Sequence, residues 1–149
     1  MMRFLKSFFL TLKERFSKEK PHSVTDRVGI NELLSRYIFS TRYFGRNPPR
    51  VKAEAYMPSR GEVSVFRIDR LTEWAIWKIG GDVASKSERT LYGRGDTRAH
   101  ELRKVGLDIL PEEPPPRHAN VVGWPENDKP RQKLIALQIA AVATLVLKE

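Results

Sequence analysis

The sequence has 149 residues, of which 40% are hydrophobic and 30% are charged, and it contains no cysteine. That composition is typical of one globular domain with its own core, and the lack of cysteine excludes disulfides, thiolate metal ligands and thiol nucleophiles. It also fits a reducing compartment, so we expect a cytoplasmic protein.

The formal net charge is +9, and it is concentrated in the N-terminal half of the chain. Residues 1–70 carry 15 basic and 7 acidic side chains, a net of +8, whereas residues 71–149 carry 12 and 11, a net of +1. A cationic field of this kind attracts polyanions such as nucleic acid. A soluble basic surface without a specific partner has the same composition, so both interpretations stay open at this point.

The first expected element is an amphipathic basic helix over residues 1–20, set apart from a single domain over residues 21–149. Its apolar stripe follows helical spacing and contains Phe8, Phe9, Leu12 and Phe16. Lys6 interrupts the apolar run, no small-residue cleavage site follows, and the segment is too short and too charged to span a bilayer. The stripe is expected to pack on its own domain, on a second copy or on another protein partner. Peripheral membrane contact is a less favoured alternative.

Residues 30–40 follow, and they predict a second helix with Asn31 as its cap. Its apolar side contains Leu33, Leu34, Tyr37 and Ile38, which fall at helical spacing. Gly45 and the pair Pro48-Pro49 come next, and they are expected to prevent regular structure there.

Basic and aromatic residues are interleaved from Arg36 to Lys52, and no acidic residue lies between Leu33 and Ala53. Cations beside exposed aromatic faces are what a phosphate backbone and unstacked bases require. The nucleic-acid-binding candidates are Arg36, Arg42, Tyr43, Phe44, Arg46, Arg50 and Lys52. The alternative is that the aromatic rings belong to the core and the arginines are merely solvated.

Strands and helices alternate beyond residue 60. Strands are expected at residues 62–68, 89–95, 107–110 and 121–124, and helices at residues 71–79 and 97–105. Thr72 caps the first of these helices, the pair Gly80-Gly81 ends or bends it, and Gly106 closes the second. Arg67 belongs to a strand with a mostly buried pattern, so its guanidinium needs a carboxylate or an anionic ligand.

The last expected element is a helix capped by Asn127 or Asp128, with Pro130 in its first turn. Over residues 134–147 only a glutamine and a threonine are polar, so this helix is apolar on every side and should be buried. The expected fold is therefore α+β. A small, mostly antiparallel sheet packs on the buried C-terminal helix, and the amphipathic helix precedes them.

His118 is the strongest candidate for catalysis, because it lies between a proline-rich connector and an apolar strand. Arg117 precedes it, and Asn120 follows on the same side of the strand. A histidine beside an amide and an arginine can bind an anion or transfer a proton. The catalytic candidates are His118, Asn120, Arg67 and Arg117. The alternative is a structural histidine that fixes the connector by hydrogen bonds.

No metal site and no cofactor are expected. The histidines are far apart in the sequence, cysteine is absent, and no pair has the spacing of a helical zinc site. The sequence also lacks the Gly-x-Ser-x-Gly motif of serine hydrolases and the lysine–serine ending of a phosphate-binding loop.

The chain resembles a family of small uncharacterised bacterial proteins in several short motifs. These are Arg36-Tyr37-Ile38-Phe39-Ser40, Ser64-Val65-Phe66-Arg67, Ile76-Trp77 with Gly80, and Pro116-Arg117-His118-Ala119-Asn120-Val121 with Gly123-Trp124-Pro125. The resemblance covers residues 33–147 and implies a compact bacterial domain, but it carries over no activity and no catalytic residue.

The sequence is compatible with two functional classes. The first is a binding module that holds nucleic acid or an acidic partner through residues 36–52. The second is a metal-independent hydrolase or transferase, for example an RNase-like enzyme, that acts on phosphate-bearing substrates around His118. The sequence does not decide between a binding protein and an enzyme.

Overall fold

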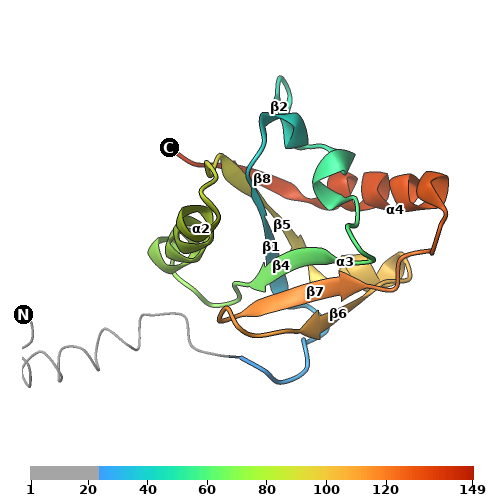
Figure 1. Ribbon diagram of the computed structural model, residues 1–149, viewed down its shortest axis with the longest axis horizontal. Helices are drawn as coiled ribbons and strands as arrows, with labels where there is room; N and C mark the ends of the chain where they lie inside the picture. The colour runs from blue at the N-terminus through green and yellow to red at the C-terminus, as the bar shows by residue number, and fades with distance from the viewer. Residues whose placement is uncertain (1–23) are drawn as a thin grey trace, which may run out of the picture.

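The computed structural model describes residues 24–149. The helix expected over residues 1–20, with Phe8, Phe9, Leu12 and Phe16, lies outside the described residues. The described part is an α+β fold built on a six-stranded sheet in which neighbouring strands are antiparallel (Figure 1). In spatial order its strands are β6 (Asp108–Pro111), β7 (His118–Val122), β4 (Val63–Arg67), β1 (Leu33–Ile38), β5 (Gly93–Arg98) and β8 (Thr144–Leu147). The mostly antiparallel sheet is therefore confirmed.

Helices lie on both sides of this sheet (Figure 1). On one face, α2 (Glu73–Ser87) packs over a small core made of Tyr37, Phe66, Ile68, Ile76 and Ile79. On the other face, α3 (Ala99–Lys104), α4 (Lys129–Val142) and the 3-10 helix η2 (Ala53–Tyr56) contribute to the larger core. Strand residues alternate between the faces, so Val65 of β4 enters the larger core while Phe66 enters the smaller one.

The prediction of a helix over residues 30–40 is wrong. Residues Leu33–Ile38 form the central strand β1, which pairs with β4 and β5. A strand covered on both faces is apolar almost throughout, so it lacks the alternation that marks a half-exposed strand. Leu34 and Ile38 enter the larger core, whereas Tyr37 enters the smaller one. The same run of apolar residues also fits helical spacing, which explains the error.

Residues 42–52 were expected to lack regular structure, and this expectation is also wrong. Residues 41–51 form a short 3-10 turn, η1 (Thr41–Tyr43), followed by a hairpin of β2 (Phe44–Arg46) and β3 (Pro49–Val51). Pro49 is the first residue of β3, a position where a strand of a two-stranded ribbon tolerates the missing N–H. The hairpin displays the arginines of this segment at the surface.

The C-terminal helix exists, but the prediction that it is buried and apolar on every side is wrong. Asp128 caps α4, as expected, by accepting a hydrogen bond from Arg131 N. The buried side chains of α4 are Ala136, Ile139 and Ala140, whereas Leu134, Leu137 and Val142 are 58%, 48% and 47% exposed. One stripe of the helix contacts the domain, and the residues that follow form the edge strand β8 against β5.

α2 continues through Gly80 and Gly81 to Ser87, so the glycine pair does not end it as the pattern predicts. A Cβ at Gly80 would lie 2.6 Å from the ring of Tyr37, so glycine at this position permits the helix to approach β1 closely. Thr72 caps α2, as expected, by accepting a hydrogen bond from the N of Ala75. The close approach explains why this glycine lies inside a helix.

The remaining elements agree with the sequence pattern in kind and differ in their ends. α3 is followed by Gly106 with a φ of +89°, so the expected closing glycine is confirmed. The strand expected at residues 89–95 lies at Gly93–Arg98. The strand expected at residues 121–124 begins earlier, at His118. This shift places His118 inside the ladder with β4, where it meets side chains that the sequence separates from it.

Candidate functional site

Four side chains from two neighbouring strands form the centre of the candidate site. In the β4–β7 pair, Ser64 lies opposite Asn120, and Phe66 lies opposite His118. Opposite residues, and residues two apart along a strand, share one face of a sheet. The antiparallel register therefore brings His118 and Asn120, both expected as site residues, together with Ser64.

His118 and Ser64 form a hydrogen-bonded pair. Nε2 of His118 lies 2.7 Å from Oγ of Ser64, and its Nδ1 lies 2.7 Å from the main-chain oxygen of Glu112. A carbonyl oxygen only accepts, so Nδ1 carries the proton of the neutral imidazole, and Nε2 accepts the hydroxyl hydrogen of Ser64. A hydroxyl, a base that accepts its proton and a third group that orients the base form the arrangement of an activated nucleophile.

The surroundings of His118 hold its imidazole in this orientation. The main-chain N of His118 donates to the oxygen of Pro115 over 3.2 Å, and its main-chain oxygen accepts from the N of Glu112 over 2.9 Å. The imidazole also packs on Phe66, with ring centroids 5.3 Å apart. Both His118 and Ser64 are only half-buried, so the pair remains accessible.

A cleft of about 390 Å³ lies beside this pair, which is within the range of sites for small molecules. It is lined by Arg36, Met57, Ser59, Arg60, Glu62, Val63, Ser64, His118 and Asn120. These residues come from β1, from the segment between η2 and β4, from β4 itself and from β7. The hydroxyl and the imidazole therefore face a volume that a substrate can occupy.

Arg36 supplies a cation to the cleft and forms no ion pair with a carboxylate within residues 24–149. Its Nε donates to the main-chain oxygen of Ala55 over 2.7 Å, and its Nη1 donates to that of Ser64 over 3.1 Å. Burial lowers the pKa of Arg36 below its ordinary value. A guanidinium held by two carbonyl groups without a neutralising charge favours an anionic group on a ligand.

Arg67, expected to be catalytic, lies outside the cleft. Its side chain is 2% exposed and forms an ion pair with Glu32, with 2.6 Å between Nε and Oε2. Its remaining hydrogen bonds go to Oε1 of Glu32 and to the main-chain oxygens of Val24, Asp26 and Arg27. All five N–H donors of the guanidinium are thereby used, so Arg67 fastens residues 24–32 to the sheet and leaves no donor for a substrate.

Arg117, the second arginine of the expected catalytic set, also lies outside the cleft. Its main-chain N donates to Oε2 of Glu113 over 2.7 Å, and its Nη1 donates to the main-chain oxygen of Arg67 over 3.0 Å. Burial, and then the charge of Arg67, lower the pKa of Arg117. The four expected catalytic residues therefore separate into two groups: His118 and Asn120 reach the cleft, whereas Arg67 and Arg117 contact each other.

The basic segment from Arg36 to Lys52 is also divided by the fold. Arg42, Arg46 and Arg50 are exposed on η1 and the β2–β3 hairpin, and Lys52 is half-buried. Tyr43 is half-buried, and Phe44 is 5% exposed and packs against Tyr92. Phe44 is therefore a core residue, so its ring does not offer the exposed stacking face that was expected of it, while the three arginines form a cationic surface.

Ser64 is the site residue that the sequence pattern missed. The period-2 alternation of residues 62–68 places Ser64 and Phe66 on the same face of a strand, but it does not identify the neighbouring strand. That neighbour is β7, and its true start at His118 was expected three residues later. A correct boundary would have brought Ser64 and His118 into one list of polar side chains.

Neither a metal centre nor a membrane span is evident in the part of the chain that the structure describes. No group of three or more His, Cys, Asp or Glu side chains among residues 24–149 could hold a metal ion. Over the same residues, the helices are too short or too polar to cross a bilayer. Comparison with protein-family models, with curated proteins and with solved structures finds no match, so the site has to be interpreted from its own geometry.

Proposed function

We propose that the protein is a metal-independent hydrolase or transferase of phosphate esters, with Ser64 as its nucleophile and His118 as its general base. The observation that supports this most strongly is the Ser64–His118 hydrogen bond of 2.7 Å, with the far nitrogen of the imidazole bound to a carbonyl oxygen. The pair borders an open cleft. Nucleophile, base, orienting group and substrate volume are thus together in one place.

The reaction consists of two displacements at phosphorus. In the first, Oγ of Ser64 forms a bond to phosphorus as its proton passes to Nε2 of His118. The bond from phosphorus to the leaving oxygen breaks, and the imidazolium returns the proton to that oxygen. In the second, His118 takes a proton from water, or from an acceptor alcohol in a transferase, and the oxygen of that molecule forms a bond to phosphorus. The bond from phosphorus to Oγ of Ser64 breaks, and the imidazolium returns the proton to Oγ, which restores the starting pair. A positioned histidine contributes about a hundredfold to ten-thousandfold to such a rate.

The charges that line the cleft support an anionic substrate. Arg36 lies beside Ser64 and has no ion-pair partner among the described residues, and the side chain of an arginine stays protonated in proteins. Arg60 adds an exposed cation, while Glu62 offsets part of the charge at the rim. A phosphate group bound in the cleft that both Arg36 and Ser64 line would supply the counter-ion that Arg36 lacks.

The proposal is tested with p-nitrophenyl phosphodiesters and p-nitrophenyl carboxylic esters as substrates. Ser64→Ala and His118→Ala are each expected to lower kcat by about a hundredfold or more. Ser59→Ala is the matched control, because Ser59 lines the same cleft while Ser64 is the serine whose hydroxyl is hydrogen-bonded to the imidazole, and this variant should keep full activity. Turnover that is equal in the wild type and in Ser64→Ala would contradict the proposal.

A second candidate function is nucleic-acid binding by the hairpin surface. Arg42, Arg46 and Arg50 are exposed on neighbouring short elements, and none of them pairs with a carboxylate in the described part of the chain. Three guanidinium groups without carboxylate partners, one on η1 and two on the hairpin, suit contacts to a phosphate backbone. The two candidates are compatible, since a nucleic acid is itself a phosphodiester.

A further inference from the structure

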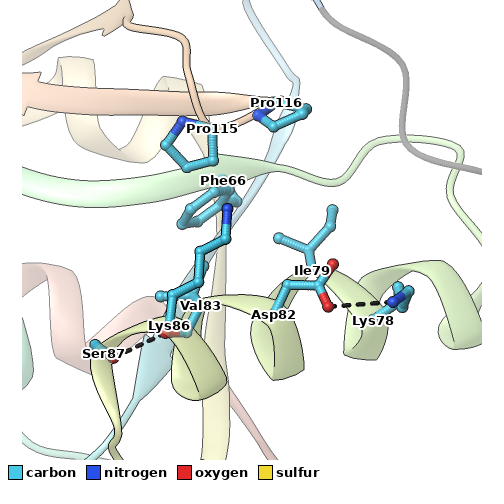
Figure 2. A pocket seen from close by; sticks show the side chains of 9 residues that line it. All are labelled: Phe66, Lys78, Ile79, Asp82, Val83, Lys86, Ser87, Pro115 and Pro116. Carbon is cyan, nitrogen blue, oxygen red and sulfur yellow. Dashed lines mark hydrogen bonds and ion pairs between the residues drawn. The ribbon is translucent and has the colours of Figure 1, made fainter.

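The protein has a second, larger pocket on the same face of the sheet as the Ser64–His118 pair. It has a volume of about 520 Å³ and lies between α2 and the proline-rich connector (Figure 2). Its apolar lining consists of Phe66, Ile79, Val83, Pro115 and Pro116, and its polar lining of Lys78, Asp82, Lys86 and Ser87. A mostly apolar pocket of this size with a few polar groups is typical of a ligand site.

Two residues that line this pocket also contact His118 of the catalytic pair. Phe66 lines the pocket, and its ring contacts the imidazole of His118 at 5.3 Å between centroids. Pro115 lines the pocket as well, and its main-chain oxygen accepts a hydrogen bond from the N of His118. Ser64 precedes Phe66 by two residues on one strand face, a distance of about 7 Å along a strand. A group bound against Phe66 is therefore close to the nucleophile.

The rim of this pocket, like the cleft, contains a basic side chain without a carboxylate partner in the described residues. Lys78 forms an ion pair with Asp82, with 3.1 Å between Nζ and Oδ1. Lys86 has no carboxylate partner in the described residues, and its side chain extends from α2 toward the connector (Figure 2). An apolar lining with an unpaired ammonium group at its rim suits an amphipathic anion, whose apolar part is removed from water.

We infer that the substrate of the Ser64–His118 pair is an amphipathic phosphodiester whose alkyl or aryl group occupies the pocket between α2 and Pro115. This inference rests on the proposed function and names the substrate class. The apolar group packs against Phe66, Ile79 and Val83, while the phosphate lies between Ser64 and Arg36. Selectivity for the apolar group then comes from a pocket that takes no part in proton transfer.

The test uses methyl, butyl and octyl p-nitrophenyl phosphate as a series of chain lengths. For the wild-type protein, kcat/KM should rise by about tenfold or more from the methyl to the octyl ester, because each buried methylene group adds favourable binding. Val83→Trp fills the pocket, and it should abolish the rise of kcat/KM with chain length. Ser85→Trp is the matched control, since Ser85 is an exposed residue of α2 outside the pocket lining.

Lys86→Trp gives a second obstruction from an exposed position, in case Val83→Trp fails to fold. Turnover that depends on Ser64 but is the same for all three esters would overturn the inference and leave the proposed function intact. A complete lack of Ser64-dependent turnover with every ester would overturn both. A chain-length preference that Val83→Trp and Lys86→Trp abolish, and that Ser85→Trp retains, would establish the pocket as the substrate-selecting site.

Discussion

Asn120 and Glu112 are joined by a hydrogen bond from the amide of one side chain to the carboxylate of the other. Glu112 lies in the connector between β6 and β7, and its main-chain oxygen accepts a hydrogen bond from the N–H at Nδ1 of His118. Asn120 is 5% exposed and belongs to the rigid strand β7. A buried amide on the sheet therefore fixes the carbonyl group that selects the tautomer of His118.

Asn120→Ala removes this support without removing either reacting group. We expect kcat to fall about tenfold to a hundredfold, because a small displacement of a catalytic group is costly, while KM changes little. The free energy of unfolding should fall by about 1 kcal/mol. Asn31→Ala is the control, since Asn31 bonds to the unrelated His100. An effect on stability alone, with kcat unchanged, would show that Asn120 has no role in positioning His118.

The close packing of α2 on β1 predicts that alanine substitutions at two adjacent glycines of α2 have opposite effects on stability. A Cβ at Gly80 would lie 2.6 Å from the ring of Tyr37, whereas a Cβ at Gly81 would meet nothing within 4 Å. Gly80→Ala should therefore lower the free energy of unfolding by about 1–3 kcal/mol through overpacking. Gly81→Ala should raise it by up to about 1 kcal/mol through helix propensity. Urea denaturation measures both, and equal effects at the two positions would contradict the close packing.

The ion pair between Arg67 and Glu32 predicts a specific loss of stability in acid. Burial raises the pKa of Glu32, but hydrogen bonds from Arg67 and Gly29 together with the charge of Arg67 outweigh it, so the pKa lies below its usual 4.5. A carboxyl group whose pKa is lowered by folding stabilises the protein above the usual pKa. The stabilisation begins to decrease when the pH falls below 4.5, the usual pKa of the carboxyl group. It is lost completely once the pH lies below the lower pKa that this group has in the folded protein.

Glu32→Gln should lower the free energy of unfolding at neutral pH by about 3–5 kcal/mol, because it leaves the buried charge of Arg67 with only a distant, solvent-exposed carboxylate, that of Asp26. The difference in stability between this variant and the wild type should shrink as the solution is acidified below pH 4.5. Asp26→Asn is the control: Asp26 is 84% exposed and 3.8 Å from Arg67, so its loss should cost less than about 1 kcal/mol. A difference that does not depend on pH would exclude this linkage.

The hairpin surface is tested by oligonucleotide binding at several salt concentrations. The triple variant with alanine at Arg42, Arg46 and Arg50 should bind more weakly, and its slope of log affinity against log salt should become shallower by about 0.9 for each lost duplex phosphate contact. A triple alanine variant removes the same charge from exposed positions away from the hairpin: Arg70 lies between β4 and α2, Lys129 begins α4, and Lys148 follows β8. If the two triple variants lose the same amount of affinity for the oligonucleotide, the binding is non-specific attraction to positive charge and the hairpin is not a binding site.

The sequence predicted the elements with clear end signals and misplaced those that depend on tertiary contacts. The caps Thr72 and Asp128 and the closing Gly106 are confirmed, because each is satisfied by atoms within a few residues. β1 was mistaken for a helix because burial on both faces removes the alternation of a strand. α4 was mistaken for a buried helix because an apolar composition does not state which side chains meet a neighbour.

The sequence also predicted only part of the candidate site, because the rest depends on tertiary contacts. His118 and Asn120 were found from their local setting, and both line the cleft. Ser64 was missed, and Arg67 and Arg117 were grouped with His118 although they lie elsewhere. Those relationships depend on the register between β4 and β7, which one sequence does not reveal.

The most direct measurement is covalent labelling by a fluorophosphonate, followed by intact mass spectrometry. If His118 activates the hydroxyl of Ser64, the wild-type protein gains one adduct, located on Ser64, and His118→Ala reacts about a hundredfold more slowly. Ser64→Ala should gain none, while Ser59→Ala should react like the wild type. An unmodified wild-type protein, or an adduct that forms equally fast in Ser64→Ala, would show that this serine is not an activated nucleophile.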